Sequence, residues 1–173
     1  MKALMLPLLF IACFASAQDA GSFYKTTTYY FERVMPFMTV ATVLTEDVQT
    51  KAIEKKISIS INVVSFGAKP ESKLKQESLS IDDAKSLLEF IELLREPLSS
   101  VPTPNPSVIY TFSPNPEFLF ALVSSDAVLG SKNKWELLIT LGSIDRLSSS
   151  VPLNKISELR DSISAAIAKA ESL

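Results

Sequence analysis

Seven consecutive residues, Ile57 to Val63, alternate between aliphatic and polar side chains without exception. Successive side chains of a β-strand point to opposite faces of a sheet, so this segment predicts a strand with one buried face. A strand of that kind is typical of an antiparallel sheet, because strands of parallel sheets are usually buried on both faces.

Further strand-like segments precede and follow this one. The Thr- and Tyr-rich run at 23–31 and the Thr- and Val-rich run at 34–44 favour strand. Apolar segments at 107–113, 118–123 and 135–141 are predicted as three more strands, with residues 125–133 as a long hairpin connection. Glu46-Asp47 is expected to form a turn, and the segment from Lys69 to Ser72 is expected to be a loop.

Two helices are predicted, each after a group of strands. Ser80 is the expected N-cap of the first, Pro97 its stop, and Asn154 the expected N-cap of the second. Each has an apolar stripe at helical spacing, formed by Ala84, Leu87, Leu88, Ile91 and Leu94 in the first and by Ile156, Leu159, Ile163, Ile167 and Ala170 in the second.

The order of elements predicts an α+β fold, in which an antiparallel sheet carries two helices that each follow a group of strands. Residues 18–173 are expected to form a single domain, since a chain of this length can bury a core of its own. The two parts, 23–96 and 107–173, share the same order, which leaves an internal duplication open. No residue-by-residue alignment of them is apparent from the sequence.

Residues 1–17 have the pattern of a secretory signal peptide. Lys2 is followed by an uncharged apolar run from Ala3 to Phe14 and then by Ala15-Ser16-Ala17, the small residues that a signal peptidase reads. We therefore expect export, to a periplasm or outside the cell, with no permanent membrane span. The alternative is a lipoprotein anchored at Cys13, although Phe10 fits that signal poorly.

Composition excludes most catalytic chemistries. The chain has no histidine and one cysteine, Cys13, so the mature part has no Ser-His-Asp or Cys-His site, no disulfide and none of the usual ligands for zinc, copper or iron. We expect no cofactor and no metal. The balance of charges is mildly acidic, which argues against nucleic acid as a partner.

The candidates that remain have simple structural explanations. Ser72 and Lys75 match the Ser-x-x-Lys pattern, but within a segment expected to be solvated. The carboxylates of Asp82, Asp83, Glu89 and Glu92 could serve a carboxylate-only hydrolase, or simply cap and solubilise the first helix.

Charge is distributed unevenly. Residues 51–75 hold six lysines against two glutamates, and residues 76–96 hold six acids against Lys85 and Arg95. The lysines are expected to flank the strand at Ile57–Val63 and to be offset by the neighbouring helix, rather than to form a functional patch.

A group of aromatic residues near the start of the mature chain is the candidate binding surface: Tyr24, Tyr29, Tyr30 and Phe31. With no catalytic pattern, we expect a non-catalytic binding or scaffolding module of the bacterial envelope, with a protein or glycan partner. The alternative is the small hydrolase that uses carboxylates only.

Overall fold

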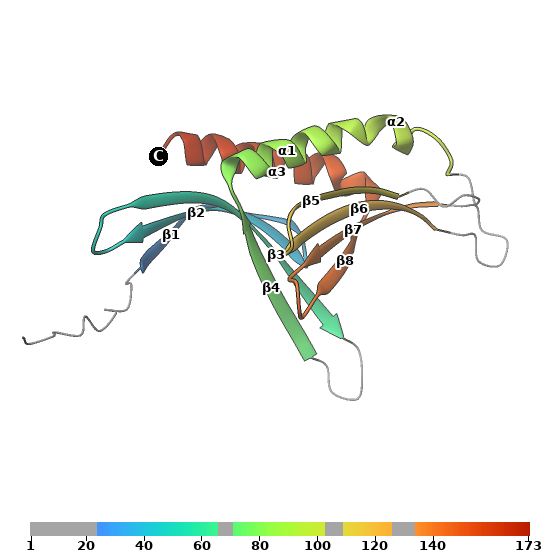
Figure 1. The fold of residues 1–173 in the computed structure, drawn as a ribbon. Coiled ribbons are helices and arrows are strands. Elements are labelled where there is room, and N and C mark those ends of the chain that lie inside the picture. The colour runs from blue at the N-terminus through green and yellow to red at the C-terminus, as the bar shows by residue number, and fades with distance from the viewer. Residues whose placement is uncertain (1–23, 66–70, 103–108, 126–133) are drawn as a thin grey trace, which may run out of the picture.

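The structure is a computed structural model and describes residues 24–65, 71–102, 109–125 and 134–173. In this part of the chain two four-stranded antiparallel sheets lie on one side of two long helices (Figure 1). The predicted α+β class, with each helix following a group of strands, is confirmed. The predicted signal peptide, including Cys13, lies outside the described residues.

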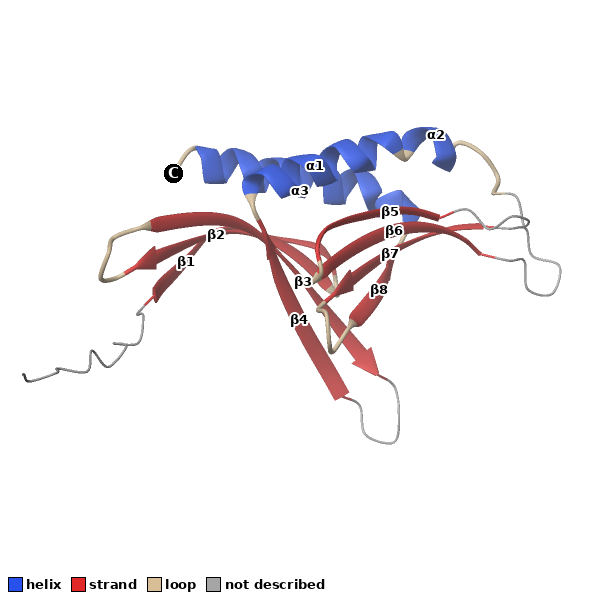
Figure 2. Ribbon diagram, viewed as in Figure 1, coloured by secondary structure: helices blue, strands red, loops and turns tan. Residues whose placement is uncertain are grey.

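The strands of each sheet are ordered as they follow one another in the chain (Figure 2). The first sheet contains β1 (Tyr24–Met35), β2 (Met38–Asp47), β3 (Ile53–Ser65) and β4 (Glu71–Leu79), followed by α1 (Ile81–Leu93) and the short α2 (Arg95–Leu98). The second contains β5 (Ile109–Asn115), β6 (Phe118–Ser125), β7 (Lys134–Leu141) and β8 (Leu147–Val151), followed by a 3-10 turn (Leu153–Lys155) and α3 (Ile156–Glu171).

The alternating segment behaves as predicted. Ile57, Ile59 and Ile61 are fully buried, and they pair across the ladder with Thr42, Val40 and Met38 of β2. These residues form the face of the first sheet that α3 covers. The strand itself is longer than the alternating segment, because β3 extends over Ile53–Ser65.

Two strands were not predicted, and both lie at the edge of a sheet. The loop prediction is wrong for Glu71 and Ser72, which are the first residues of β4, and the serine-rich segment Leu147–Val151 forms β8. Each buries little apolar surface, since Leu79 and Val151 are their only fully buried apolar residues. An edge strand with one wet face has little hydrophobic pattern, so periodicity could not identify it.

The helix boundaries agree in part with the predictions. Ser80 caps α1, because its Oγ accepts a hydrogen bond from the backbone N–H of Asp83 at 3.0 Å. The helix ends at Leu93, however, and Pro97 lies inside α2 rather than acting as the stop. Asn154 is not the cap of α3: it lies in the 3-10 turn, and Lys155 occupies the N-cap position without a side-chain bond.

The structure provides the alignment of the two parts that the sequence did not show. Met38, Val40 and Thr42 pair with Ile61, Ile59 and Ile57, and the residues 80 positions later (Phe118, Phe120, Leu122 with Leu141, Ile139, Leu137) pair in the same register. From β4 onwards the equivalent residue of the second half lies 72 positions later instead of 80, an offset shown by two pairs: Leu79 pairs with Ile57, and Val151 pairs with Leu137. The β3–β4 hairpin of the first half is therefore the longer one.

Both helices make contacts across the two halves: α3 lies on the first sheet, whereas α1 lies against β3 and β4 of its own half and β5 of the other. α3, which belongs to the second half, packs on β1, β2 and β3 of the first. Thr42 of β2 donates a buried hydrogen bond of 2.7 Å to the backbone oxygen of Ala166 in α3. Phe90 of α1 packs in turn on Phe112 and Phe120 of the second sheet. Both halves thus contribute to one continuous core.

Candidate functional site

An apolar groove lies where α1 and α2 meet the second sheet. It has a volume of about 650 Å³ and is lined by Phe90, Leu93, Leu94, Glu96, Pro97, Ser99, Ser100 and Tyr110. Leu93 is 74% exposed on its rim, although it lies in an otherwise polar row of α1. A large aliphatic side chain held in water beside a groove is typical of a contact surface.

Aromatic packing fixes the floor and one end of the groove. The ring of Phe90 lies 5.7 Å from that of Phe112 and 6.0 Å from that of Phe120. Tyr110 packs at 6.0 Å against Trp135, whose indole N–H donates a 2.8 Å hydrogen bond to the backbone oxygen of Ser100. This bond ties the segment after α2 to the second sheet, so the groove is shaped by residues with fixed neighbours.

The strand beside the groove is an edge. β5 pairs only with β6 among the described strands, and Ile109 at its start is 61% exposed. The backbone groups on the outer edge of such a strand are available to an added strand. Groove and edge together offer a site for alternate side chains and a site for main-chain hydrogen bonds.

The equivalent place in the other half has no break in its helix. By the register, Tyr110 corresponds to Tyr30, and Pro97 corresponds to Lys169 of α3. α3 is one continuous helix to Glu171, and Lys169 Nζ lies 5.9 Å from the ring centroid of Tyr29. The break between α1 and α2 is therefore specific to the half that carries the groove.

The aromatic residues predicted as a binding surface all belong to β1. Tyr24 and Tyr29 are 61% and 46% exposed, but they lie five residues apart, and Tyr29 is partly covered by Lys169. Tyr30 and Phe31 pair with Thr42 and Ala41, and their side chains lie outside the described part. Only the exposed pair Tyr24 and Tyr29 therefore remains to be tested as a surface.

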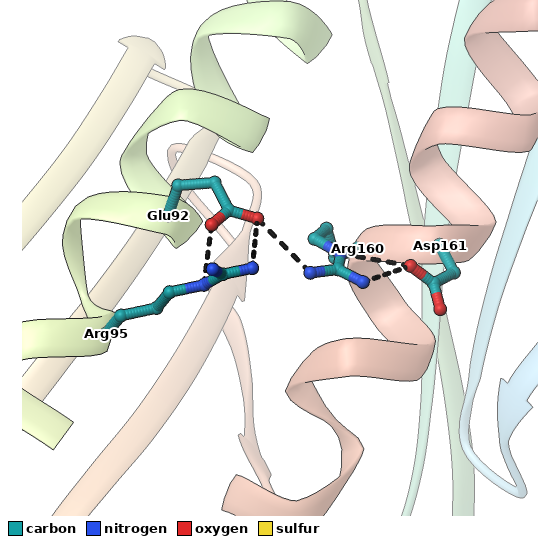
Figure 3. Close-up of polar contacts among 4 residues, drawn as sticks. All are labelled: Glu92, Arg95, Arg160 and Asp161. Atoms are coloured by element: carbon teal, nitrogen blue, oxygen red, sulfur yellow. Dashed lines mark hydrogen bonds and ion pairs between the residues drawn. The ribbon is translucent and has the colours of Figure 1, made fainter. Parts of the chain in front are cut away.

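The carboxylates of α1 take part in surface contacts. The Asp83 carboxylate accepts a hydrogen bond from Ser80, and Glu92 contacts both Arg95 and Arg160, the latter at 3.2 Å. Figure 3 shows that Arg160 also contacts Asp161, so these groups form a chain of ion pairs between α1 and α3. Such a chain fixes one helix against the other and offers no pair of carboxylates across a cleft.

Another carboxylate pair lies between the two halves and was not predicted. The Ser143 hydroxyl and backbone N–H donate to Glu117 at 2.5 and 2.7 Å, and these bonds, helped by Lys75, lower the pKa of Glu117. Burial, and then the charge of Glu117, raise the pKa of Glu77. Opposite shifts are typical of acid–base pairs, yet neither side chain lines any groove found in the described residues.

The Ser-x-x-Lys match does not form a pair. Ser72 and Lys75 are three residues apart in β4, so their side chains point to opposite faces of the sheet. The Ser72 hydroxyl donates to Asn62 Oδ1 at 2.6 Å, while Lys75 lies against Gly142. A lysine on the other face cannot act as the general base for this serine.

Two residues that matter for the groove, Leu93 and Tyr110, were missed by the sequence analysis. The signal for Leu93 was an aliphatic residue outside the apolar stripe of its helix. Tyr110 had no local signal, because the groove forms where α1 and α2 meet the second sheet.

No helix of the described residues is long and apolar enough to span a bilayer. No protein-family model matches the chain, and no curated protein matches it significantly.

Proposed function

We propose that this protein is an exported, non-catalytic binding module that takes up an extended segment of a partner polypeptide beside β5. The observation that carries the proposal is the apolar groove next to an edge strand, with Leu93 exposed on its rim and Tyr110 of the edge strand in its lining. Export rests on the sequence of residues 1–17 alone.

An extended peptide fits this surface better than a glycan or a compact domain. The edge of β5 supplies main-chain donors and acceptors, which an added strand can pair, and the groove receives every second side chain. Apart from Glu96 the lining is uncharged, so the segment should be apolar or weakly basic. The arrangement suits binding, and Glu96 is the one carboxylate in the described lining of the groove.

The alternative, a hydrolase that uses carboxylates only, would need two carboxylates on the walls of a cleft. Glu77 and Glu117 have the shifted pKa values but no cleft, and Glu92 is held by two arginines. The described structure therefore favours binding.

A peptide-binding measurement tests the proposal. The probe is a library of ten-residue peptides that alternate Val or Phe with Ser or Thr, and the best binder is measured again in detail. Leu93→Asp should weaken it at least tenfold, because a charge would enter the groove. Val48→Asp is the matched control: Val48 is also exposed, at 44%, but lies in the β2–β3 turn.

The backbone contribution needs a second comparison. The same peptide with N-methyl groups on alternate residues cannot donate along one edge, and it should also bind at least tenfold more weakly. Equal losses from Leu93→Asp and Val48→Asp, or no peptide that binds below about 1 mM, would show that this surface is not a peptide site.

A further inference from the structure

A polar groove lies on the face of the first sheet that the helices leave uncovered (Figure 1). Its volume is about 280 Å³, just below the roughly 300–1,000 Å³ typical of small-molecule sites. One row of side chains crosses all four strands and lines the groove; from β1 to β4 these residues are Arg33, Thr39, Ser60 and Gln76. Residues that pair in this way point to one face, here opposite to the buried isoleucines on either side of Ser60.

The adjoining pair on the same face is Asn62 and Leu74. The Asn62 backbone N–H donates to the backbone oxygen of Phe37 at 2.7 Å, and its Oδ1 accepts from the Ser72 hydroxyl at 2.6 Å. The amide of Asn62 is therefore fixed, and its NH₂ group remains available as a donor to a ligand. Leu74, which is 68% exposed, and Phe37 add apolar surface beside these polar groups.

The polar groups of this groove have spare hydrogen-bonding capacity. Arg33 and Gln76 make no hydrogen bond or ion pair with any described residue. The hydroxyls of Thr39 and Ser60 bond to each other, which occupies only one of their two protons. The described lining contains one charged residue, Arg33, and no carboxylate. A ligand should therefore carry a negative charge, whereas an ammonium group on it would find no partner here.

The second half has a smaller groove of about 240 Å³ at the equivalent place, but its chemistry differs. Three residues of the first groove are replaced there by smaller or apolar ones: Ser113 for Arg33, Leu119 for Thr39 and Gly142 for Asn62. The cation of the second groove is Arg146, which by the offset of 72 occupies the position of Leu74. The row that joins guanidinium, hydroxyl and amide groups is thus particular to the first half and is not a property of the shared fold.

None of the lysines expected to form no functional patch lines this groove. Lys73 and Lys75 alternate with Leu74 and Gln76 in β4, so they point to the other face of the sheet. The lysines between residues 51 and 56 lie at or before the start of β3, whereas the groove lies near its end. Residues 73–75 and 145–147 line a separate groove between the two halves, to which both faces of β4 contribute.

We propose that the groove on the first sheet binds a sugar ring that carries one carboxylate, as in a hexuronic acid. A guanidinium donates two parallel hydrogen bonds to a carboxylate, so Arg33 holds the acid group. The hydroxyl pair and the two amides bond to the hydroxyls of the ring, and the apolar residues cover its C–H groups. A neutral sugar leaves the guanidinium without a partner, and a simple carboxylate leaves the remaining polar groups without one.

NMR titration of the ¹⁵N-labelled full chain tests these statements. The probes are the methyl glycosides of glucuronic, galacturonic and mannuronic acid, each compared with its neutral parent sugar and with acetate. The best uronide should bind at least tenfold more tightly than its neutral counterpart and than acetate. The largest shifts should be those of the backbone amides of Thr39, Ser60 and Gln76.

Two variants separate the roles of the groups. Arg33→Gln should weaken the best uronide at least tenfold and change binding of the neutral sugar less than twofold, and since Arg33 is exposed the fold should persist. Gln76→Ala should weaken both sugars by a similar factor of at least three. The matched control is Arg146→Gln, the same change in the equivalent groove, which should alter binding less than twofold.

Four outcomes would overturn the proposal: no uronide with a Kd below about 20 mM, a neutral sugar bound as tightly as the uronide, acetate bound as tightly as the uronide, or equal losses in Arg33→Gln and Arg146→Gln. The site is independent of the peptide groove beside β5. Leu93→Asp should therefore leave uronide binding unchanged, and failure of either site leaves the other to be judged by its own probe.

Discussion

The second half of the chain buries two aromatic rings where the first half buries smaller side chains, although their strands pair in the same register. Met38 and Val40 occupy the positions of Phe118 and Phe120, and Thr42 occupies that of Leu122. The covering helices differ to match. α3 presents the small residues Ser162, Ala166 and Ala170 to the first sheet, whereas α1 brings Phe90 to the second.

This difference shows how one backbone plan accommodates two kinds of core. Small residues let α3 come close enough for Thr42 to donate its hydrogen bond to the backbone oxygen of Ala166. In the second half the larger Leu122 occupies the position of Thr42. The larger aromatic rings hold α1 over a sheet whose outer end stays open at Tyr110. The half with bulky packing is also the half with the groove.

The largest effect should come from the aromatic core. Phe120→Ala should lower the free energy of unfolding by about 3–5 kcal/mol, because it leaves a cavity and removes the contact with Phe90. Val40→Ala, at the equivalent position, should lower it by only about 1.5–3 kcal/mol. Urea denaturation of both variants measures the difference, and a larger loss for Val40→Ala would reverse our comparison of the two cores.

The equivalence of the helices predicts two similar effects. Leu87 and Leu159 are both fully buried at corresponding positions, so either substitution by alanine should cost about 2–5 kcal/mol. Because α3 covers the first sheet, and α1 contacts both its own half and the second sheet, both variants should still unfold in one transition. Glu89→Ala, on the exposed face of α1, is the control and should cost under about 0.5 kcal/mol. Two separate transitions would mean that the halves are independent.

The buried hydrogen bond of Thr42 has no counterpart in the second half. Thr42→Val keeps the shape and removes the donor to Ala166, and it should cost about 1 kcal/mol in urea denaturation. Thr26→Val serves as the control, because Thr26 is exposed and its side chain makes no hydrogen bond with a described residue. A stability equal to that of the original protein would show that the close approach of α3 does not depend on this bond.

The smallest effects should concern the carboxylates between the halves, and they should depend on pH. The pKa of Glu117 is lowered, so its stabilisation is present above the ordinary value of 4.5 and is lost as the pH falls through the lowered one. Glu117→Gln should therefore lower the melting temperature at pH 7 but not at strongly acidic pH.

Glu77 should behave in the opposite way. Its pKa is raised, so its favourable contribution is present below 4.5 and is lost as the pH rises through the raised value. Glu77→Gln should then leave the melting temperature at pH 7 unchanged or raise it. A drop at pH 7 in Glu77→Gln as large as in Glu117→Gln would contradict the assigned directions.

Much of the fold could be predicted from local patterns. The alternation at Ile57–Val63, the run at Phe118–Val123 and the stripe of α1 each carry enough apolar residues to identify their element. β4 and β8 could not be found, because each contributes one fully buried apolar residue and many serines, lysines and glutamates. Their strand conformation comes from pairing with β3 and β7, which is a tertiary effect.

The candidate sites were largely beyond reach of the sequence. Leu93 and Tyr110 are 17 residues apart and meet only because α1 lies on the sheet of the second half. Residues 73–75 and 145–147 line one groove only because strands of the two halves meet there. Both combinations depend on contacts between the two halves, which no local pattern in either half indicates.

The position of α3 on the first sheet also has a consequence for synthesis of the chain. The first sheet is complete once Leu79 has been made, but its cover begins only at Ile156. At roughly 5–20 residues per second, about 4–15 s pass between the synthesis of Leu79 and that of Ile156. During that interval the apolar face of the first sheet, which includes Val40 and Ile59, lacks the sixteen-residue helix that covers it in the folded protein.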